Sequence, residues 1–243
     1  MISFLKTIIY VPLYNILVLL LNVDWIDAGL AAVILTVLVK IVLYPLAKKS
    51  VVTQTKMKEK EGELSLIKEK YKDRQEQTLK IMEFYKKNNI NPFSSILTIL
   101  LQIPIIFSLY YIFFQSGLPS IDTSILYSFV RAPGSVSMDF LGIIDVSQKS
   151  IILALLAAAT SFWQMHLAST SSKNKLAKSS QPNLKEDFPA MMNKQMKYTM
   201  PFIVFFVSWR ISAIVALYWF VSNLVGVAQD VYIRRQMAKN QVA

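Results

Sequence analysis

One lysine, Lys40, interrupts an apolar stretch at residues 31–44. Counted from the basic residues that begin at Lys48, it lies eight positions deep, which is about 12 Å in a helix that rises 1.5 Å per residue. A lysine at this depth either extends its aliphatic stem toward the surface or faces a water-filled cavity among helices. The cavity reading predicts a site where the ammonium group attracts acidic groups, and the sequence leaves both readings open.

Other polar and aromatic side chains in the apolar stretches could share such a cavity: Thr36, Gln102, Gln164, Tyr218 and Trp219. Thr36 lies one helical turn before Lys40 on the same face. Taken one at a time, these residue types are more typical of hydrogen bonds between helices or of aromatic side chains at a membrane interface. The residues alone therefore supply candidates for a polar cavity without grouping them into one site.

The residue types needed for catalysis or for holding a cofactor are scarce. The chain has one His, six Gly and no Cys, and no pair of acidic residues lies within an apolar stretch to act as general acid and base. The sequence contains no Gly-rich phosphate loop and no cluster with metal-ligand spacing. We therefore expect no catalytic residue, no metal and no cofactor, and we do not expect an enzyme.

Long apolar blocks must position these residues. The chain is 54% hydrophobic with a mean hydropathy of +0.42, and its apolar blocks cover residues 2–23, 28–46, 96–114, 151–167 and 200–233. A helix of about 18 to 20 apolar residues crosses the roughly 30 Å hydrocarbon layer of a bilayer. The last block is long enough for two spans and is interrupted at Arg210, whose charge favours a turn at the interface.

Charge alternates between the segments that join these blocks. Residues 48–92 carry twelve Lys and Arg against seven acidic residues, whereas residues 115–149 carry two against three. The positive-inside rule predicts this alternation for helices threaded back and forth through a bilayer, so the net charge of +11 needs no nucleic-acid partner. We expect a multi-pass protein in the lipid bilayer, with its N-terminus outside and its C-terminus cytoplasmic, and no DNA binding.

The first block, residues 2–23, allows two readings. Its length permits a sixth span. Alternatively, Lys6, Tyr10, Tyr14 and Asn15 fit an amphipathic helix whose polar residues meet water at the outer surface. We favour the external surface helix.

Residues 48–89 form the one sizeable polar segment of the sequence. Apolar residues recur at helical spacing between Met57 and Tyr71, and a second, shorter helix is marked by apolar residues between Leu79 and Tyr85. Asp73 is placed to cap the start of that second helix. The pattern predicts a cytoplasmic helical hairpin whose charged faces are either simply solvated or contact anionic lipid, ribosomal RNA or a nascent chain.

The fold class predicted is an all-α integral membrane protein, a five-span helical bundle with a cytoplasmic helical hairpin and an N-terminal external amphipathic helix. In chain order we expect an external interfacial helix (1–26), a first span (27–47), the cytoplasmic hairpin (48–90), a second span (91–116), an external loop (117–148), a third span (149–168), a cytoplasmic loop (169–197), the fourth and fifth spans (198–233) and a cytoplasmic tail (234–243).

The order of these parts resembles the YidC/Oxa/Alb family of membrane protein insertases, in particular short bacterial YidC, over nearly the whole chain. The matching motifs are Tyr44-Pro45-Leu46 after Lys40, FYKKNNINP at 84–92, LQIPI at 101–105, DFLG at 139–142, FWQ at 162–164, MKYTMP at 196–201 and ALYWFVSNL at 216–224. The motif at 84–92, where the hairpin finishes, and the motif at 101–105 in the second span form a quite specific pair.

This resemblance implies a bundle with a polar groove that opens to the cytoplasm and to lipid and is closed toward the outside. Carried over by position, Lys40, Thr36, Gln164 and Trp219 line the groove, with Tyr218 and Gln102 as further candidates. Two departures stand out. Lys40 replaces the usual arginine, which keeps the charge but loses the two-pronged donor, and residues 211–214 replace the usual Phe-Pro-Ala-Gly turn.

The resemblance also implies the function. We expect a membrane protein insertase and chaperone of the bacterial plasma (inner) membrane, which inserts and helps to fold nascent membrane proteins through a positively charged groove. The ribosome and the Sec translocon are further candidate partners. The alternative from another class is a small-solute transporter or channel that uses the same polar cavity.

Overall fold

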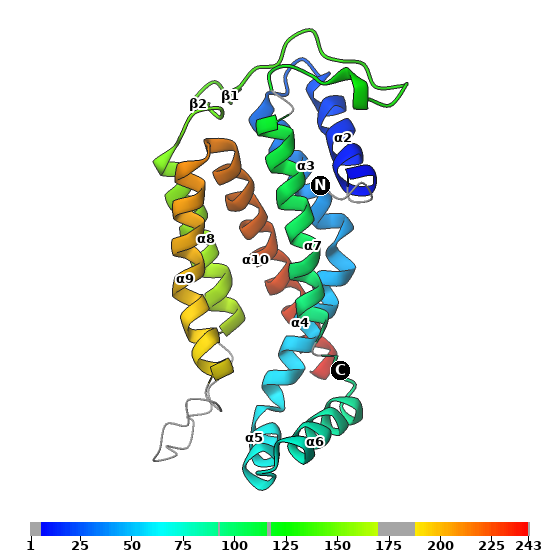
Figure 1. Ribbon diagram of the computed structural model, residues 1–243, viewed down its shortest axis with the longest axis vertical. Coiled ribbons are helices and arrows are strands. Elements are labelled where there is room, and N and C mark those ends of the chain that lie inside the picture. Colours follow the sequence, from blue (N-terminus) through cyan, green and yellow to red (C-terminus); the bar gives the residue numbers. More distant parts are fainter. Residues whose placement is uncertain (1–5, 92, 116–117, 170–187, 243) are drawn as a thin grey trace.

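The protein is almost entirely helical in the computed structural model, which describes residues 6–91, 93–115, 118–169 and 188–242 (Figure 1). Its α-helices are α2 (Val11–Leu21), α3 (Ala28–Val42), α4 (Tyr44–Glu59), α5 (Glu61–Lys70), α6 (Arg74–Lys87), α7 (Phe93–Tyr110), α8 (Ile151–Ser169), α9 (Phe188–Arg210) and α10 (Ala213–Val242). Shorter elements are η1 (Lys6–Tyr10), η2 (Tyr111–Gln115), η3 (Thr123–Ile125) and the antiparallel pair β1 (Asp139–Phe140) and β2 (Ile144–Asp145).

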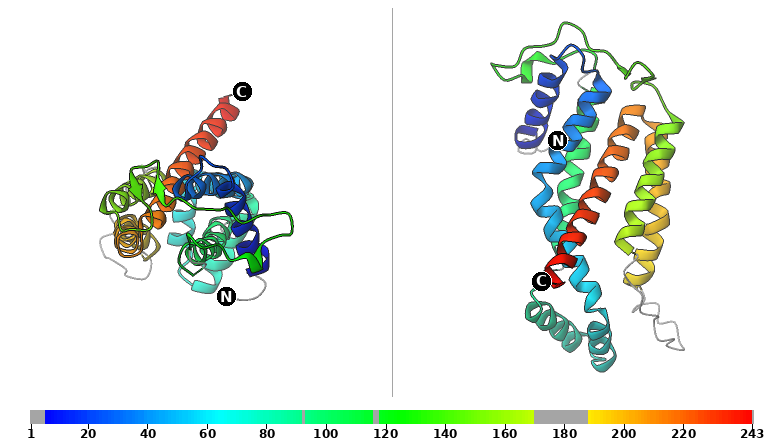
Figure 2. Two further views of the ribbon diagram at one scale, coloured as in Figure 1. Left: turned by 90° about the horizontal axis from the view of Figure 1, so that it is seen from above. Right: turned by 180° about the vertical axis from the view of Figure 1, so that it is seen from behind.

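Helix α10 tilts across the bundle (Figures 1 and 2). It begins beside α8 and α9, at the end of the molecule where residues 118–150 join α7 to α8, and it finishes beside α4. It packs on α8, α3 and α4, while α9 packs on α8 and α7 packs on α4. We call the end with residues 118–150 the loop end, and the opposite end, with α5 and α6, the hairpin end.

Small side chains are buried on both α3 and α10, which pack on each other. Ala28 and Ala32 on α3 are buried, as are Ala213 and Ala216 on α10. Small residues let helix backbones approach their neighbours closely, which is how helices associate where apolar burial alone gives no preference for a partner.

The first predicted span, residues 27–47, does not run straight. The chain bends by 61° between α3 and α4, with Leu43 at the break and Pro45 just inside α4. Proline has no N–H to donate and its ring clashes with the carbonyl four residues earlier, so a continuous helix through this point is disfavoured. The second helix then continues to Glu59, well into the predicted hairpin.

The loop end is tied to the starts of two helices. The backbone N–H of Ala28 donates to the Ser137 carbonyl (2.9 Å), and that of Ala213 donates to the Gln148 carbonyl (2.7 Å). Asp27 caps α3 at Leu30 and also accepts the N–H of Leu141. These bonds satisfy N–H groups that a helix start otherwise leaves without a partner.

The same contacts account for the turn at residues 211–214. Helix α9 ends at Arg210, as the charge in the last apolar block predicted, and α10 begins at Ala213. The N–H of Ile214 donates to the Val146 carbonyl (3.1 Å). The loop therefore supplies the hydrogen bonds that hold this turn, although the Pro-Ala-Gly sequence is absent.

A glycine allows the loop to pack on α3. A Cβ built at Gly29 would lie 2.5 Å from Cδ2 and 2.6 Å from Cβ of Phe140. Contacts this close essentially never occur between real atoms, so the ring of Phe140 occupies the space that a larger residue at position 29 would need. The β1–β2 pair is thereby held against the start of α3.

Helix α2 carries its polar residues inward. Tyr14 and Asn15 are fully buried, whereas Ile16 and Leu19 are exposed. The interpretation that these polar residues meet water is therefore wrong: they bond the loop instead. The Asn15 amide donates to the Ile125 carbonyl (3.0 Å), its oxygen accepts the Tyr127 N–H (2.7 Å), and the Tyr14 hydroxyl accepts the N–H of Asp122 (2.7 Å).

The hairpin end is built from α5 and α6, which lie side by side away from the bundle (Figure 1). Asp73 caps α6 by accepting the N–H groups of Gln75 and Glu76, which confirms the predicted cap. The Gln77 side chain donates to the Lys68 and Tyr71 carbonyls at the end of α5. Helix α6 has 14 residues and α5 has 10. The prediction that the second helix of the hairpin is the shorter one is therefore wrong. Helix α6 extends beyond both Leu79 and Tyr85, the apolar residues that marked it.

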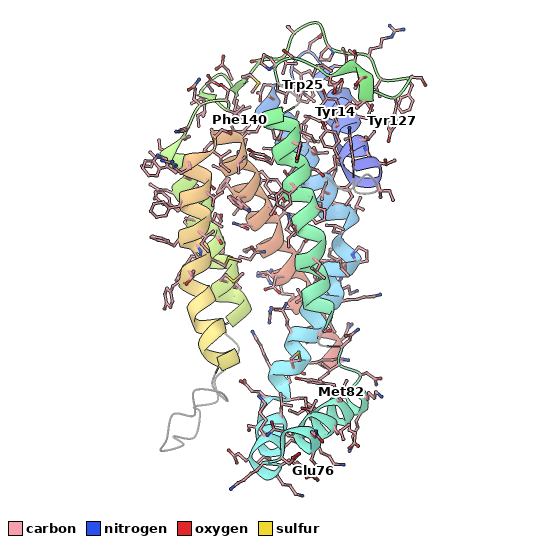
Figure 3. All side chains as sticks on the ribbon, in the orientation of Figure 1. Tyr14, Trp25, Glu76, Met82, Tyr127 and Phe140 are labelled. Atoms are coloured by element: carbon pink, nitrogen blue, oxygen red, sulfur yellow. The ribbon has the colours of Figure 1, made fainter. Side chains whose placement is uncertain are left out.

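Figure 3 places the labelled aromatic residues Tyr14, Trp25, Tyr127 and Phe140 at the loop end and Glu76 and Met82 at the hairpin end. Trp25 is 73% exposed. Aromatic side chains with an apolar ring and a polar edge are typical of membrane–water interfaces.

Among the helices that the structure describes, α10 over Ala213–Asn240 is long and apolar enough to cross a bilayer alone, and the bent α3–α4 pair qualifies if it counts as one span. Shorter apolar helices cover Lys6–Leu21, Gln102–Phe113 and Ile151–Leu167. Position 92, near the start of the predicted second span (91–116), and residues 170–187 of the predicted cytoplasmic loop lie outside the described residues. Helix α9 begins at Phe188, before the predicted span start at 198.

Candidate functional site

Lys40 continues the inward stripe of α3. Ala28, Ala32 and Thr36 are buried at four-residue intervals, and Lys40 is the next position on that face. Ile41 and Val42, which follow it at the end of α3, are 60% and 75% exposed. Lys40 itself is half-buried. Lys40 therefore lies at the edge of the buried face of α3.

The charge of Lys40 is not neutralised within the described part of the chain, where the ion pairs involve other residues: Lys60 with Glu63, Lys80 with Glu83, and Arg234 with Asp230. A half-buried ammonium group without a carboxylate partner attracts anions more strongly than one at a fully exposed position, because the surrounding dielectric is lower.

Thr36 lies deeper than Lys40, and its hydroxyl donates to the Ala32 carbonyl in the same helix (2.7 Å). Its only hydroxyl proton is thus used within α3, and the side chain is 2% exposed. Thr36 can still accept a hydrogen bond, but its burial keeps it from solvent.

Gln102 and Tyr218 join α7 to α10. The Gln102 amide donates to the Tyr218 hydroxyl, and the tyrosine is 5% exposed. The structure thus brings together the two residues that the family resemblance left as less central candidates.

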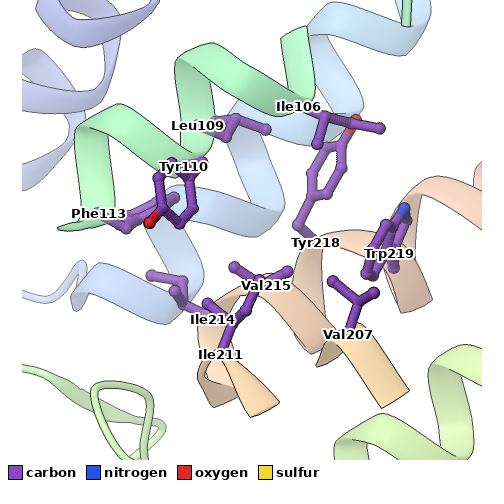
Figure 4. Close-up of a pocket in the computed structure, with 10 residues that line it drawn as sticks. All are labelled: Ile106, Leu109, Tyr110, Phe113, Val207, Ile211, Ile214, Val215, Tyr218 and Trp219. Atoms are coloured by element: carbon purple, nitrogen blue, oxygen red, sulfur yellow. The ribbon is translucent and has the colours of Figure 1, made fainter. Parts of the chain in front are cut away.

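Tyr218 and Trp219 border a cavity of about 50 Å³ between α7, α9 and α10 (Figure 4). The remaining lining residues are Ile106, Leu109, Tyr110, Phe113, Val207, Ile211, Ile214 and Val215. An opening of this size has room for water, but apolar walls leave such cavities dry or filled by apolar groups. Lys40, Thr36, Gln102 and Gln164 do not line it, so this cavity and the Lys40 position are separate features.

Gln164 lies at the contact between α8 and α10. Its amide nitrogen occupies the space where a Cβ at Gly226 would project. One turn away, the Asn223 amide donates to the Ala157 carbonyl (3.3 Å) and lies 3.5 Å from the Thr160 hydroxyl. The structure therefore places Gln164 in a polar strip between α8 and α10, whereas Gln102 joins α7 to α10.

Sequence reasoning did not single out the polar residues at the hairpin end of α10. The Gln229 amide donates to the Lys40 carbonyl (2.9 Å), and Arg234 donates to Asp230 (2.9 Å) and to Thr55 on α4 (3.4 Å). The available signal was that Gln229 and Asp230 lie within the last apolar block, where uncompensated polar residues are costly.

No metal site is indicated among the described residues, because no three His, Cys, Asp or Glu side chains gather there to hold an ion. The described residues instead include one half-buried lysine on α3 and side-chain amides that join α7 to α10 and α8 to α10.

The chain matches the model of the 60Kd inner membrane protein family over residues 20–240. It is 30% identical over 211 residues to a membrane protein insertase YidC of Fusobacterium nucleatum, covering 86% of this chain and 87% of that protein. It is likewise 30% identical over 213 residues to a YidC of Clostridium tetani, covering 87% of this chain and 84% of that protein.

The longer YidC of Wolinella succinogenes is 31% identical over 232 residues, which is 93% of this chain but 38% of that protein. The chain thus corresponds to nearly the whole of the shorter relatives and to little more than a third of the longer one. The resemblance inferred from the motifs is confirmed. This chain belongs to the 60Kd inner membrane protein family and, within it, to the YidC membrane protein insertases.

Proposed function

We propose that this chain inserts nascent membrane proteins into a bacterial inner membrane, and that Lys40 attracts acidic residues of the substrate segment that must cross. The observation that carries the proposal is a lysine on the inward face of α3 without an ion-pair partner in the described part of the chain, in a member of the YidC insertases.

The proposed topology has five spans: α3 with the start of α4, then α7, α8, α9 and α10. The hairpin end faces the cytoplasm and the loop end faces outside, because the hairpin and the last turns of α10 are basic whereas residues 115–149 are not. The N-terminus lies outside and the C-terminus in the cytoplasm. On this topology Lys40 is reached from the cytoplasmic side.

The proposed mechanism uses electrostatic attraction followed by release into lipid. A carboxylate about 4 Å from the Lys40 amine gains about 4 kcal/mol at an effective dielectric of 20, enough to favour partial entry of a hydrated acidic segment. The apolar part of the substrate then leaves along α8 and α10, where burial of its surface in lipid drives the step. Exposed apolar residues on α8, such as Ile152 and Leu155, fit that exit path, and no nucleotide is needed.

The partners proposed are the nascent chain, the lipid bilayer and, at the charged hairpin, the ribosome, with the Sec translocon as a further partner. A small-solute transporter fits the molecule less well. The cavity described above is apolar and offers no polar path for a solute, and family membership favours the insertase.

Reconstitution in liposomes tests the proposal. Two one-span substrates would be compared, identical except that the external segment of one is acidic and that of the other is neutral, and insertion would be scored by protease protection. We expect Lys40→Glu to lower insertion of the acidic substrate at least about tenfold, because attraction becomes repulsion. Lys49→Glu, the same change at an exposed position of α4, should have little effect. Equal insertion by wild type and Lys40→Glu would remove the electrostatic mechanism.

A further inference from the structure

The hairpin end of α10 contacts the α3–α4 bend through polar side chains at two levels. Gln229 bonds the last turn of α3, and Arg234 bonds Thr55 in the following helix, α4. These two contacts lie on opposite sides of the 61° bend. A single helix therefore contacts both arms of the bend.

The contact made by Gln229 compensates for the break in the helix. The last carbonyls of a helix have no partner in the following turn, and at a break within a membrane such groups must be satisfied by neighbouring helices. The Lys40 carbonyl is one of them, and it accepts the Gln229 amide at 2.9 Å. Its donor comes from a residue 189 positions later in the chain.

The contact made by Arg234 orients α4, the arm beyond the bend. Arg234 is held by Asp230 in its own helix (2.9 Å) and reaches the Thr55 hydroxyl with a second nitrogen (3.4 Å). Both charged side chains are mostly buried, with 24% and 14% of their surfaces exposed. A carboxylate that fixes a guanidinium in this way limits the orientations of the contact to α4.

We propose that Gln229 is a positioning residue for Lys40: its hydrogen bond keeps the last turn of α3 closed and so keeps the Lys40 side chain turned toward the bundle. This inference rests on the proposed role of Lys40 in insertion. Lys40 lies three residues before the bend at Leu43, where helices fray most easily. If the turn opened, the long lysine stem could extend toward the hairpin-end surface, and the charge would leave the path of the substrate.

The functional test is a substitution of Gln229 with leucine, which keeps the bulk and removes the donor. The matched control is Gln236→Leu, because the Gln236 amide donates to Tyr232 within α10 (2.9 Å) rather than to an arm of the bend. In the liposome assay we expect Q229L to lower the ratio of acidic to neutral substrate inserted by about two- to tenfold, the factor that corresponds to one net hydrogen bond. Q236L should leave the ratio unchanged.

A double substitution separates positioning from general loss of structure. If Gln229 acts through Lys40, adding Q229L to Lys40→Gln should not change the ratio further. The inference would be overturned if Q229L lowered the insertion of both substrates equally. It would also be overturned if Q229L lowered the ratio of acidic to neutral substrate inserted by the same factor with and without Lys40. If wild type itself shows no preference for the acidic substrate, the proposed role of Lys40 fails instead.

Distance measurements decide the geometry independently of insertion. Because the chain has no cysteine, spin labels can be placed through single cysteines at the exposed positions Leu38 on α3 and Glu59 on α4. We expect Q229L to broaden the distance distribution across the bend and Q236L to leave it unchanged. Identical distributions in all three proteins would show that Gln229 does not fix the bend.

Discussion

Asn15 offers the sharpest test of how the loop end is held together. Its side chain is 1% exposed and makes both a donor and an acceptor contact with the loop, to the Ile125 carbonyl (3.0 Å) and from the Tyr127 N–H (2.7 Å). The same amide also donates to the Val11 carbonyl within α2 (2.8 Å). Substituting leucine keeps the side-chain volume and removes every one of these bonds.

The expected cost follows from the two bonds to the loop. Each contributes about 0.5–1.5 kcal/mol net, and a buried group left without its partner costs a further 1–3 kcal/mol or so. We therefore expect Asn15→Leu to destabilise the contact between α2 and the loop by about 2–6 kcal/mol. At about 1.4 kcal/mol per tenfold change, hydrogen exchange at the Tyr127 amide should accelerate by about 30- to 20,000-fold.

Asn22→Leu is the matched control. Asn22 also bonds the loop, through the Arg131 carbonyl (2.7 Å), but it is exposed, so water can replace the lost bond and the acceleration should stay below about tenfold. Hydrogen exchange measured by mass spectrometry in detergent or nanodiscs resolves peptides from residues 118–136. If Asn15→Leu accelerates exchange there no more than Asn22→Leu does, the loop is held by something other than this buried amide.

Three further predictions concern stability. Gly29→Ala should lower the free energy of unfolding by about 1–3 kcal/mol, because its new Cβ meets Phe140 at the base of the ring, which cannot move away easily. Gly226→Ala meets only the flexible end of the Gln164 side chain and should cost less than about 1 kcal/mol. Unfolding in denaturant compares the two variants, and equal losses of stability would contradict the packing described. Asp73→Ala should cost about 0.5–2 kcal/mol through the lost helix cap, seen as increased hydrogen exchange in the hairpin, and unchanged exchange would rule the cap out as a determinant. The hydroxyl of Ser124 donates to Asp122 (2.6 Å) and holds the pKa of that carboxyl below its ordinary value. The stabilising effect of this hydrogen bond is therefore present above the ordinary pKa of the carboxyl and is lost as the pH falls through the lowered pKa. Ser124→Ala should raise the pKa of Asp122 in a carboxyl NMR titration, and an unchanged pKa would contradict this assignment.

Local rules predicted several features of the fold. The apolar blocks, the break at Arg210 and the cap at Asp73 depend on residues close in sequence, and the structure has all three. The family could also be predicted, because motifs such as DFLG and ALYWFVSNL are short and contiguous. Features that depend on neighbouring residues in the chain are those that a single sequence carries most directly.

The direction of polar side chains in α2 could not be predicted in the same way. Tyr14 and Asn15 are compatible with a surface helix as long as their partners are unknown, and those partners lie more than 100 residues later in the loop. A buried polar residue looks like a solvated one in sequence, since only the tertiary fold shows whether its hydrogen bonds are satisfied.

The candidate site likewise has features that the local sequence predicts and features that depend on tertiary contacts. Periodicity places Lys40 and Thr36 on one face of α3, where Thr36 is buried and Lys40 is half-buried. The pairing of Gln102 with Tyr218 and the contact of Gln229 with the Lys40 backbone join helices distant in sequence, and no spacing rule indicates them. The groove itself remains a proposal, and its test must report on water and charge at Lys40.

Charge rescue at position 40 is the most direct measurement. In this cysteine-free chain, Lys40→Cys can be modified in inside-out membrane vesicles with impermeant thiosulfonate reagents that attach either a cationic or an anionic group. The account predicts reaction from the cytoplasmic side and none from the loop side, with the cationic adduct restoring insertion of the acidic substrate and the anionic adduct failing to restore it. A thiol that reacts from neither side, or two adducts with the same insertion activity, would contradict the claim that a hydrated positive charge at Lys40 guides the substrate.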